Sequence, residues 1–470
     1  MIKLIIEKEL REIIGSTKFA VTFGVSSILI ILSFYVGGRN YQIGTEQYES
    51  SKREDFRKME GITDWNEVRD HRVFLPPQPV ASLVMGVSND IGRTMEIHGR
   101  GELTAEDSRY GDDPIYAVFR FLDLDFIFQI VLSLFAILFA YDAINGEKER
   151  GTLRLTFANP VPRGSYILGK MLGSLFGLAL PLLIPILIGS TVLLLMKIPL
   201  QTPDWVRLAL VVACGFLYFG AFLALSLFIS SLTERSSHSF LLLLIIWILS
   251  VMVVPRIAVL LAGRAIDVPS VDELGSKKSR YAASLWQEDR KKMADFKSTP
   301  GVPANEVLKG FQKFMSQMGD EREKKIQEFG RQLNENRTNK QRLQEDLAFG
   351  LSMVSPSAVF SLASTTISGT GLRLANNFQH EAETYQTSYG EFMKEKTGMN
   401  PGGGMVFRIS TDNDTKKDPV NLNELPVFEF RREPLRAVLG SIALDFGILA
   451  LFNILFFAGA FISFLRYDVR

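Results

Sequence analysis

The chain has 470 residues, of which 47% are hydrophobic and 22% charged, and its formal net charge at pH 7 is +1. This balance gives no general attraction to nucleic acid, so no nucleic-acid partner is expected. The single cysteine, Cys214, excludes disulfides within the chain and any cluster of cysteine ligands, and no metal site is expected from four scattered histidines. The many phenylalanines beside many charged residues indicate apolar and polar segments that alternate along the chain, as in a membrane protein.

Residues 1–18 are predicted to form an N-terminal interfacial helix. Its apolar residues recur at helical spacing, at Ile2, Ile6, Leu10, Ile13 and Ile14. Lysine, arginine and glutamate fill much of the remaining surface. This pattern is typical of a helix that lies in the membrane interface, and a solvated amphipathic helix is the alternative.

Six segments are long and apolar enough to cross about 30 Å of hydrocarbon as helices of about 20 residues. Because the bilayer core offers no partner to a free backbone N–H or C=O group, a helix is the expected form of each. The predicted spans cover residues 19–36, 122–142, 172–195, 208–232, 240–261 and 437–465. The sequence therefore predicts an α-helical polytopic membrane protein with six transmembrane helices.

Lysine and arginine gather in the short segments that six alternating spans place on one side of the membrane. These segments are the N-terminal helix, the loop 143–170 and the tail 466–470. Short cytoplasmic segments carry such an excess, so both chain ends are predicted to be cytoplasmic. The long segments 37–118 and 263–436 then lie outside by parity. The expected location is the bacterial cytoplasmic membrane.

The two long segments predict a mainly helical α+β extracytoplasmic domain. Residues 276–297 and 306–347 are charged and favour helix, and the prolines at 300 and 303 between them predict an antiparallel helical hairpin, with plain solvated helices as the alternative. Alternating apolar and polar residues predict short strands at 405–410 and 427–430. The glycines at 401–404 predict a flexible joint.

The loop between the second and third spans carries the candidate functional site. Its charged groups are suited to meet a soluble partner, and its apolar side chains are suited to anchor that contact. A loop that merely carries the positive charge of the cytoplasmic side is the alternative. The candidate residues are Glu147, Glu149, Arg150, Gly151, Thr152, Leu153, Pro160 and Arg163.

This loop resembles that of the ABC-2 permease family, which has a Glu-x-Glu-x-Gly-Thr-Leu stretch, then a proline, an arginine and a Gly-Lys pair before the third span. Here the stretch runs from Glu147 to Leu153, and the pair is Gly169-Lys170. The six-span topology, the N-terminal helix and the arginine-rich end are similar too. Residues 355–371 resemble a segment of the subgroup that contains the nitrous-oxide-reductase maturation permease.

The resemblance implies the fold of the ABC-2, or type V, exporters, and it identifies the loop as the coupling helix that docks on an ATPase. It further implies two copies of an ABC ATPase subunit, a second permease that is identical or a sister chain, and a lipid bilayer around them. ATP and magnesium would bind to the ATPase, so no cofactor and no catalytic residue is expected on this chain. Gly164–Lys170 fails as a phosphate loop because Met171 stands where a serine or threonine is required.

The large outer segments leave a second function open. A mechanotransmission or scaffold subunit would use ATP energy to move the outer domain against an extracytoplasmic protein, with no cargo crossing the membrane. The exporter would instead reshape a path between two permeases. The sequence does not name a substrate for either.

Ionisable groups within the predicted spans are few. Arg256 lies near the outer end of the fifth span, and Asp445 lies about two turns into the last span. Because an unpaired carboxylate in lipid costs several kcal/mol, a pair between Arg256 and Asp445 is expected. Alternatively, each side chain reaches the outer interface separately.

Overall fold

A computed structural model describes residues 2–68, 71–88, 91–97, 103, 105–106, 123–294, 304–397 and 419–466. Within them, six helices are long and apolar enough to cross a membrane, as the sequence predicts. We call these helices the apolar bundle. It comprises α2 (Thr17–Met59), α3 (Leu124–Phe126) with η4 (Ile127–Leu132) and α4 (Ser133–Ala140), α7 (Arg163–Leu195), α8 (Thr202–Leu232), α9 (Ser236–Ile248) with η5 (Leu249–Val253) and α10 (Val254–Ala265), and α15 (Leu435–Leu465).

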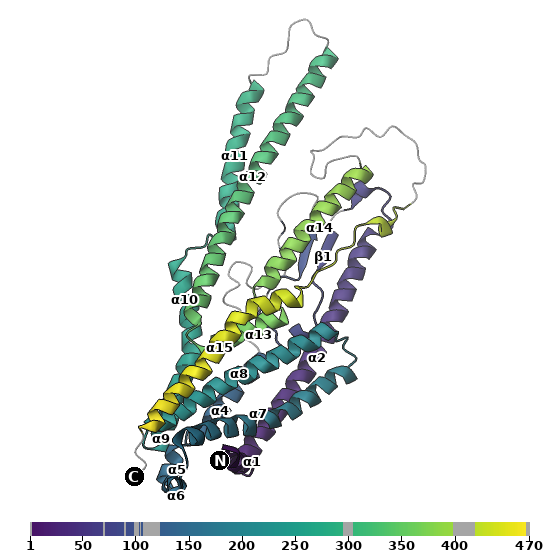
Figure 1. Cartoon of the computed structure of the whole chain (residues 1–470). Helices are drawn as coiled ribbons and strands as arrows, with labels where there is room; N and C mark the ends of the chain where they lie inside the picture. Colours follow the sequence, from purple (N-terminus) through teal and green to yellow (C-terminus); the bar gives the residue numbers. More distant parts are fainter. Residues whose placement is uncertain are drawn as a thin grey trace.

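The two ends of the apolar bundle differ (Figure 1). At one end, which we call the terminal end, lie α1 (Ile2–Ile14), α5 (Asn145–Glu149), α6 (Thr152–Phe157) and the last turn of α15. At the other end lies a polar domain. It contains the far half of α2, β1 (His71–Phe74), β2 (Thr94–Ile97), β3 (Ala105–Glu106), α11 (Val271–Ala294), α12 (Ala304–Ser352), α14 (Arg373–Thr397) and the short helices η1 (Trp65–Glu67), η2 (Val80–Ser82) and η6 (Leu422–Glu424).

Helix α2 joins the two regions without a break. The sequence predicts that the first span ends at residue 36, but the helix continues to Met59. The glycines that follow the span are sites of close packing: a Cβ on Gly37 would lie 2.7 Å from the Ser82 carbonyl oxygen, and one on Gly38 would lie 2.8 Å from the Met196 sulfur. The polar residues beyond them favour helix, so α2 forms a continuous rod from the bundle into the polar domain.

A three-stranded antiparallel sheet in the order β1-β2-β3 lies beside the far half of α2. Its register pairs His71 with Ile97 and Thr94 with Glu106. The strand predicted at 427–430 is wrong, because these residues form no strand in the described part of the chain. Phe428 instead packs on Phe378 of α14, with ring centroids 6.0 Å apart. Residues 401–410, with the other predicted strand and the flexible joint, lie outside the described residues.

The buried side chains of His71, Asp55 and Tyr385 link β1, α2 and α14 in the polar domain. His71 of β1 bonds through Nδ1 to the Asp55 carboxylate of α2 at 3.0 Å and through Nε2 to the Tyr385 hydroxyl of α14 at 2.8 Å. Burial and the neighbouring tyrosine and aspartate charges raise the pKa of Tyr385 well above its ordinary value. The tyrosine therefore stays neutral and links α14 to α2.

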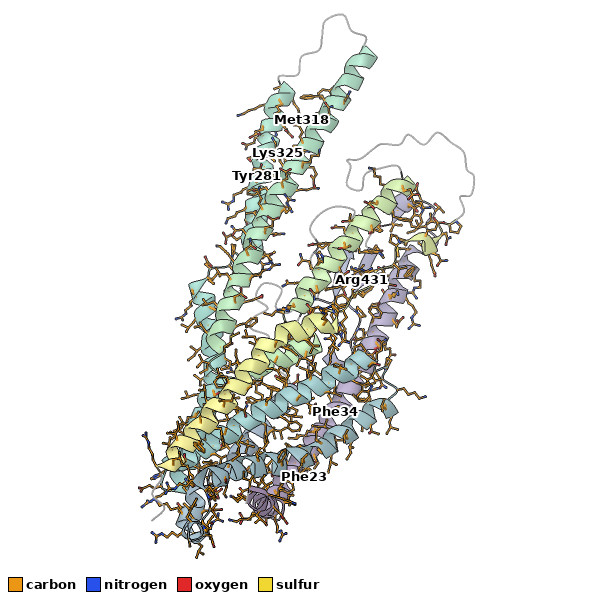
Figure 2. The ribbon with its side chains drawn as sticks, in the orientation of Figure 1. Phe23, Phe34, Tyr281, Met318, Lys325 and Arg431 are labelled. Carbon is orange, nitrogen blue, oxygen red and sulfur yellow. The ribbon has the colours of Figure 1, made fainter. Side chains whose placement is uncertain are left out.

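Helices α11 and α12 form the predicted antiparallel hairpin, which extends well beyond the rest of the molecule (Figures 1 and 2). The guanidinium of Arg322 stacks 3.6 Å from the Trp286 ring and contacts the Asp289 carboxylate at 2.6 Å. A cation–π contact with a paired charge holds the two helices in register. The prolines at 300 and 303 lie outside the described residues.

Helix α13 (Pro356–Ser368) is buried between the ends of the spans that adjoin the polar domain. The π-helical turns η4 and η5 both pack against it, and such turns are frequent at functional sites. The Ser355 hydroxyl donates to the Ser250 carbonyl of η5 at 2.6 Å, while the Gln129 side chain of η4 donates to the Ser357 hydroxyl at 2.6 Å. The segment 355–371 thus closes this end of the bundle.

Candidate functional site

Helices α5 and α6 form a short angled segment at the terminal end. Gly151 separates them with φ +76°, a left-handed conformation that favours glycine, and the segment turns sharply there. The Ser230 hydroxyl of α8 accepts from the backbone N–H groups of Ile144 and Asn145 at 3.1 and 3.3 Å. These bonds fix the start of α5 to the end of α8.

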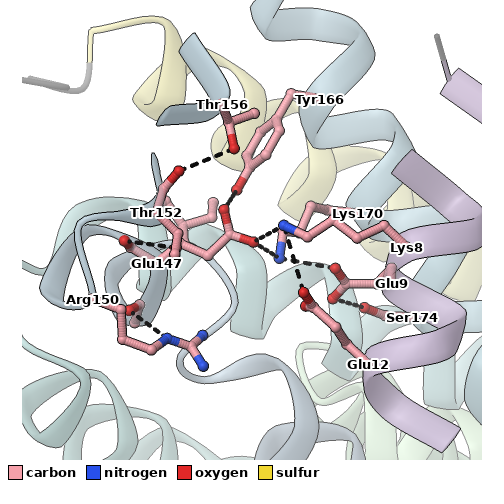
Figure 3. A network of polar contacts seen from close by, with 12 residues as sticks. Lys8, Glu9, Glu12, Glu147, Arg150, Thr152, Thr156, Tyr166, Lys170 and Ser174 are labelled. Atoms are coloured by element: carbon pink, nitrogen blue, oxygen red, sulfur yellow. Dashed lines mark hydrogen bonds and ion pairs between the residues drawn. The ribbon is translucent and has the colours of Figure 1, made fainter. Parts of the chain in front are cut away.

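Glu147 is the centre of a buried network (Figure 3). Only 2% of Glu147 is exposed. One carboxylate oxygen contacts the ammonium groups of Lys170 at 2.8 Å and Lys8 at 3.1 Å, and the other accepts from the Tyr166 hydroxyl at 2.7 Å. The expectation that this carboxylate is offered to a soluble partner is wrong, because three side chains of the same chain already surround it.

Lys170 links Glu147 to a second buried carboxylate, that of Glu9 at 2.9 Å. The side chain of Lys170 is buried, although Lys8 is partly exposed. Two lysines and two glutamates balance in charge, which is how a protein tolerates ions out of water. The network joins α1, α5 and α7 into one unit.

Three glycines of α7 allow α1 to approach closely enough for this network. A Cβ on Gly169 would lie 2.7 Å from Ile5, and one on Gly173 would lie 2.6 Å from the Glu9 Cβ. Gly177, one turn further, faces Ile13. Small residues spaced by four form a groove on a helix, and α1 lies in it. The placement of α1 in a membrane interface stays a prediction, but part of its apolar side contacts α7.

The three carboxylates of Glu9, Glu12 and Glu147 lie close enough together to bind a cation. The ammonium groups of Lys8 and Lys170 lie among them and form ion pairs with all three carboxylates. This arrangement favours an ion-pair network over a metal site. Residues 164–170 lie within the helix α7, so they form no phosphate loop.

The other candidate residues divide between an exposed face and a buried one. Leu153 is fully buried, whereas Leu155, two residues later, is 71% exposed. The exposed face of α5 and α6, which we call the end face, is formed by Glu149, Arg150, Gly151, Thr152, Arg154, Leu155, Ala158, Asn159 and Pro160. Its apolar point, Leu155, is surrounded by charged and polar groups, as at the edge of a protein interface.

Two candidate residues attach this segment to further spans. The Glu149 carboxylate accepts from the backbone N–H and the hydroxyl of Ser236, at 2.9 and 2.6 Å, and so caps α9. Arg163 donates to the Leu465 carbonyl at the end of α15, at 2.5 Å.

Contacts from α5, α6 and the loops beside them reach every span of the apolar bundle. Lys18 of α2 lies 3.8 Å from the Asp142 carboxylate just before α5, and the ring of Phe157 in α6 lies 5.9 Å from that of Phe464 in α15. The contacts to α7, α8 and α9 are those of Glu147, Asn145 and Glu149 described above, and α5 continues the span that contains α4.

The predicted pair between Arg256 and Asp445 does not form, and no other ion pair joins either residue to a described side chain within 4.0 Å. Arg256 is exposed on α10, and α10 packs mainly against α12. Asp445 is half-buried on α15, where it lines a cavity together with Arg373. The sequence places both residues at the same depth but does not show that their helices are apart.

Comparison with known proteins identifies the class. A family model described as ABC-2 family transporter protein matches residues 4–469. The chain therefore belongs to the ABC-2 family of transporter proteins, and it is a multi-pass helical membrane protein of the ABC transporter class.

Particular relatives match over shorter stretches. The chain is 44% identical over 68 residues to a protein of Pseudomonas aeruginosa named probable ABC transporter permease protein NosY, which is 14% of this chain and 24% of that protein. It is 51% identical over 43 residues to a protein of the same name from Stutzerimonas stutzeri, 9% of this chain and 16% of that protein. The chain thus covers less than a quarter of the length of these relatives.

Proposed function

We propose that this chain is the permease subunit of an ABC exporter and that separate ABC ATPase subunits dock on its end face. The observation that carries the proposal is the contact of α5, α6 and their adjoining loops with all six spans. A displacement applied to this segment would reach every helix of the bundle at once. Membership of the ABC-2 family supports an ATPase partner. The described residues of this chain also contain no phosphate loop.

The buried network gives this segment the stiffness that coupling needs. If α5 moved alone, Glu147 would leave Lys170 and Tyr166, and a buried charge would lose its partners. Breaking such a pair costs roughly 3–5 kcal/mol. Movement of α5 together with α1 and α7 avoids that cost, so ATP-driven closure of the ATPases would shift these three helices as one body.

The proposed assembly has two ATPase subunits, which bind ATP and magnesium, and a second permease, identical or a sister chain. Lysine and arginine at the terminal end favour a cytoplasmic position for that end in a bacterial cytoplasmic membrane. The polar domain would then be extracytoplasmic. The substrate path would lie between the two permeases.

A substitution of Leu155 by aspartate tests the docking surface. Burying a leucine at an interface is worth about 1.5–3 kcal/mol, so Leu155→Asp should weaken association with the ATPase about tenfold or more. Val427→Asp is a matched control, because Val427 is also 71% exposed but lies in the polar domain. Both variants should fold and insert normally. A pull-down of the ATPase and permease-stimulated ATP hydrolysis measure the effect. Equal binding by both variants would rule out the end face as the docking site.

A mechanotransmission role is the second candidate, and the continuous 43-residue helix α2 favours it. A rod that crosses the bundle and enters the polar domain would carry a displacement to an extracytoplasmic partner. Glu46 is exposed in the polar half of α2, and Glu46→Pro should kink the rod at a cost of about 3 kcal/mol or more. A mechanotransmitter would lose its action on the partner while ATP hydrolysis stays stimulated. An exporter would keep its flux with Glu46→Pro. The control Glu46→Ala should keep the flux of an exporter and the partner action of a mechanotransmitter.

A further inference from the structure

A cavity of about 300 Å³ lies where the outer ends of α8 and α15 meet α12, α13 and α14. It therefore lies at the junction of the apolar bundle and the polar domain, far from the end face. Part of its wall is apolar and includes Phe349, Met353, Leu362 and Leu444. Leu444 is 61% exposed on a helix long and apolar enough to span the membrane, so the cavity is bordered by a surface suited to lipid.

The rest of the wall carries charges of both signs. The basic groups are Arg207, Arg373 and Arg432, and the acidic groups are Glu345, Asp346, Glu433 and Asp445. Some are occupied: Arg207 donates to the carbonyl oxygens of Ile367 and Glu433 at 2.7 and 2.6 Å, and Arg432 pairs with Asp204.

Several polar groups of the wall have no hydrogen-bond partner among the described residues. Arg207 Nε, Arg432 Nε and Nη2 and Gln78 Oε1 are buried and unsatisfied. Arg373 and Asp346 are exposed and Asp445 is half-buried, and none of the three forms an ion pair within 4.0 Å with a described side chain, although they line one cavity. Buried polar groups are normally satisfied, so the unpartnered atoms of Arg207, Arg432 and Gln78 need an explanation, while the exposed charges of Arg373 and Asp346 are accessible to a ligand of complementary charge.

We propose that this cavity binds the headgroup of an aminophospholipid, a zwitterionic amphiphile with a phosphate and a primary ammonium group. The arginines would donate to the phosphate, for which guanidinium groups have matching geometry. The ammonium group would approach Asp346 and Asp445, and the acyl chains would run along Leu444 into the bilayer. A plain anion would leave the carboxylates unpaired, and an uncharged lipid would leave the arginines unpaired.

The exposed apolar surface near the cavity supports a lipid over a soluble zwitterion. Leu351 and Val354, at the end of α12 and just beyond it, are 40% and 75% exposed, and they flank the cavity residue Met353. A soluble ligand would need no apolar surface outside its pocket. The bound lipid is either a resident of the surrounding bilayer or a transported molecule of the same chemistry.

Native mass spectrometry of the purified full chain, without an ATPase, tests the binding. We expect phosphatidylethanolamine to be retained about tenfold more strongly than phosphatidylglycerol, a difference of one charge-assisted contact. Arg373→Gln and Asp346→Asn should each reduce this retention several-fold. Arg436→Gln on α15 and Glu328→Gln on α12 are controls, because both residues are exposed and outside the cavity wall.

Equal retention of the two lipids, or cavity variants that bind like the controls, would overturn the proposal. Displacement of the lipid by inorganic phosphate alone would also overturn it, because that outcome indicates a simple anion site. In nanodiscs with the ATPase and ATP, unchanged lipid occupancy identifies a resident lipid, and occupancy that falls with turnover identifies cargo. Because the first measurement uses no ATPase, it is independent of the proposed exporter function.

Discussion

Two groups of charged residues lie at opposite ends of the apolar bundle, and they differ in how their charges are satisfied. At the terminal end, Glu147 contacts Lys170 at 2.8 Å, and Lys170 contacts Glu9 at 2.9 Å. At the other end, arginines and carboxylates surround a cavity of about 300 Å³, and several of their polar atoms have no described partner. A network whose charged groups all pair within the chain holds helices together, whereas a network with unpaired groups can still bind a ligand.

This difference separates two roles that a sequence presents in the same way. Both groups are charged residues at the ends of apolar helices. In the terminal network each charged side chain forms an ion pair with a side chain of the same chain. Substitution of one of these residues should therefore affect folding first. In the cavity, substitution should affect ligand retention first and folding less. The following predictions test that division, from the largest effect to the smallest.

The largest effect is expected from Lys170→Met. The methionine would fill similar space but would leave the carboxylates of Glu147 and Glu9 buried without their shared partner. Loss of one member of a buried pair costs about 3–5 kcal/mol. We expect a large fall in the apparent melting temperature of the purified chain in detergent, and a low yield of folded protein in the membrane.

Lys8→Met is the matched control for this change. Its ammonium group contacts the same Glu147 oxygen at 3.1 Å, but 45% of the side chain is exposed, so water can replace it. A loss of no more than about 1 kcal/mol is expected. If both lysine variants melted alike, the network would not depend on burial, and its role as a rigid joint would be wrong.

A smaller effect is expected from Gly173→Ala. The added methyl group would lie 2.6 Å from the Glu9 Cβ, so α1 would have to move away from α7. Overpacking of this kind costs about 1–3 kcal/mol, and it would also lengthen the contact between Glu9 and Lys170. The melting temperature should fall, and permease-stimulated ATP hydrolysis should fall with it.

Gly447→Ala in α15 provides the comparison for this glycine. No atom lies within 4 Å of a Cβ built there, and alanine favours helix more than glycine does, so stability should be unchanged or slightly higher. A Gly173→Ala variant as stable as Gly447→Ala would show that α1 does not depend on the glycine groove.

The sequence predicts the long features of this fold well, since they depend on length and hydrophobic composition. Six spans and the α11–α12 hairpin follow from runs of many residues. The strands β1 to β3 are missed because each has four residues or fewer, and their pairing depends on packing against α2 and α14. The end of α2 is missed because glycines that allow close packing look like helix breakers in a sequence.

The sequence predicts where the candidate site lies, but it does not predict the roles of its individual residues. The family resemblance selects the loop, but it does not separate Glu147, which is buried, from Glu149, which is exposed. Which side of a short helix faces the protein depends on neighbours distant in the chain, here Lys8 and Lys170. One signal was present: Glu9 lies four residues from both Ile5 and Ile13, on the apolar side of α1. A carboxylate there predicts a buried partner.

The smallest effect concerns Glu345, which lines the cavity. Burial, with the charge of Asp346 as a second cause, raises the pKa of Glu345 above its ordinary value. A carboxyl group whose pKa is higher in the folded than in the unfolded chain is charged at a cost in the fold. That cost is present at pH values above the folded pKa and disappears as the pH falls below the unfolded value of about 4.3.

Glu345→Gln removes this charge, so it should raise the apparent melting temperature near neutral pH and leave it unchanged near pH 4. The gain should be less than about 1 kcal/mol, because the side chain is only partly buried. Glu335→Gln, on an exposed part of α12, should change little at either pH. Thermal unfolding in detergent at the two pH values measures both variants. Phosphatidylethanolamine should reduce this gain in stability, because its ammonium group would offset part of the unfavourable burial of the Glu345 charge. A loss of stability at neutral pH would mean that Glu345 has a partner in the fold, and the cavity would then resemble the closed network at the terminal end.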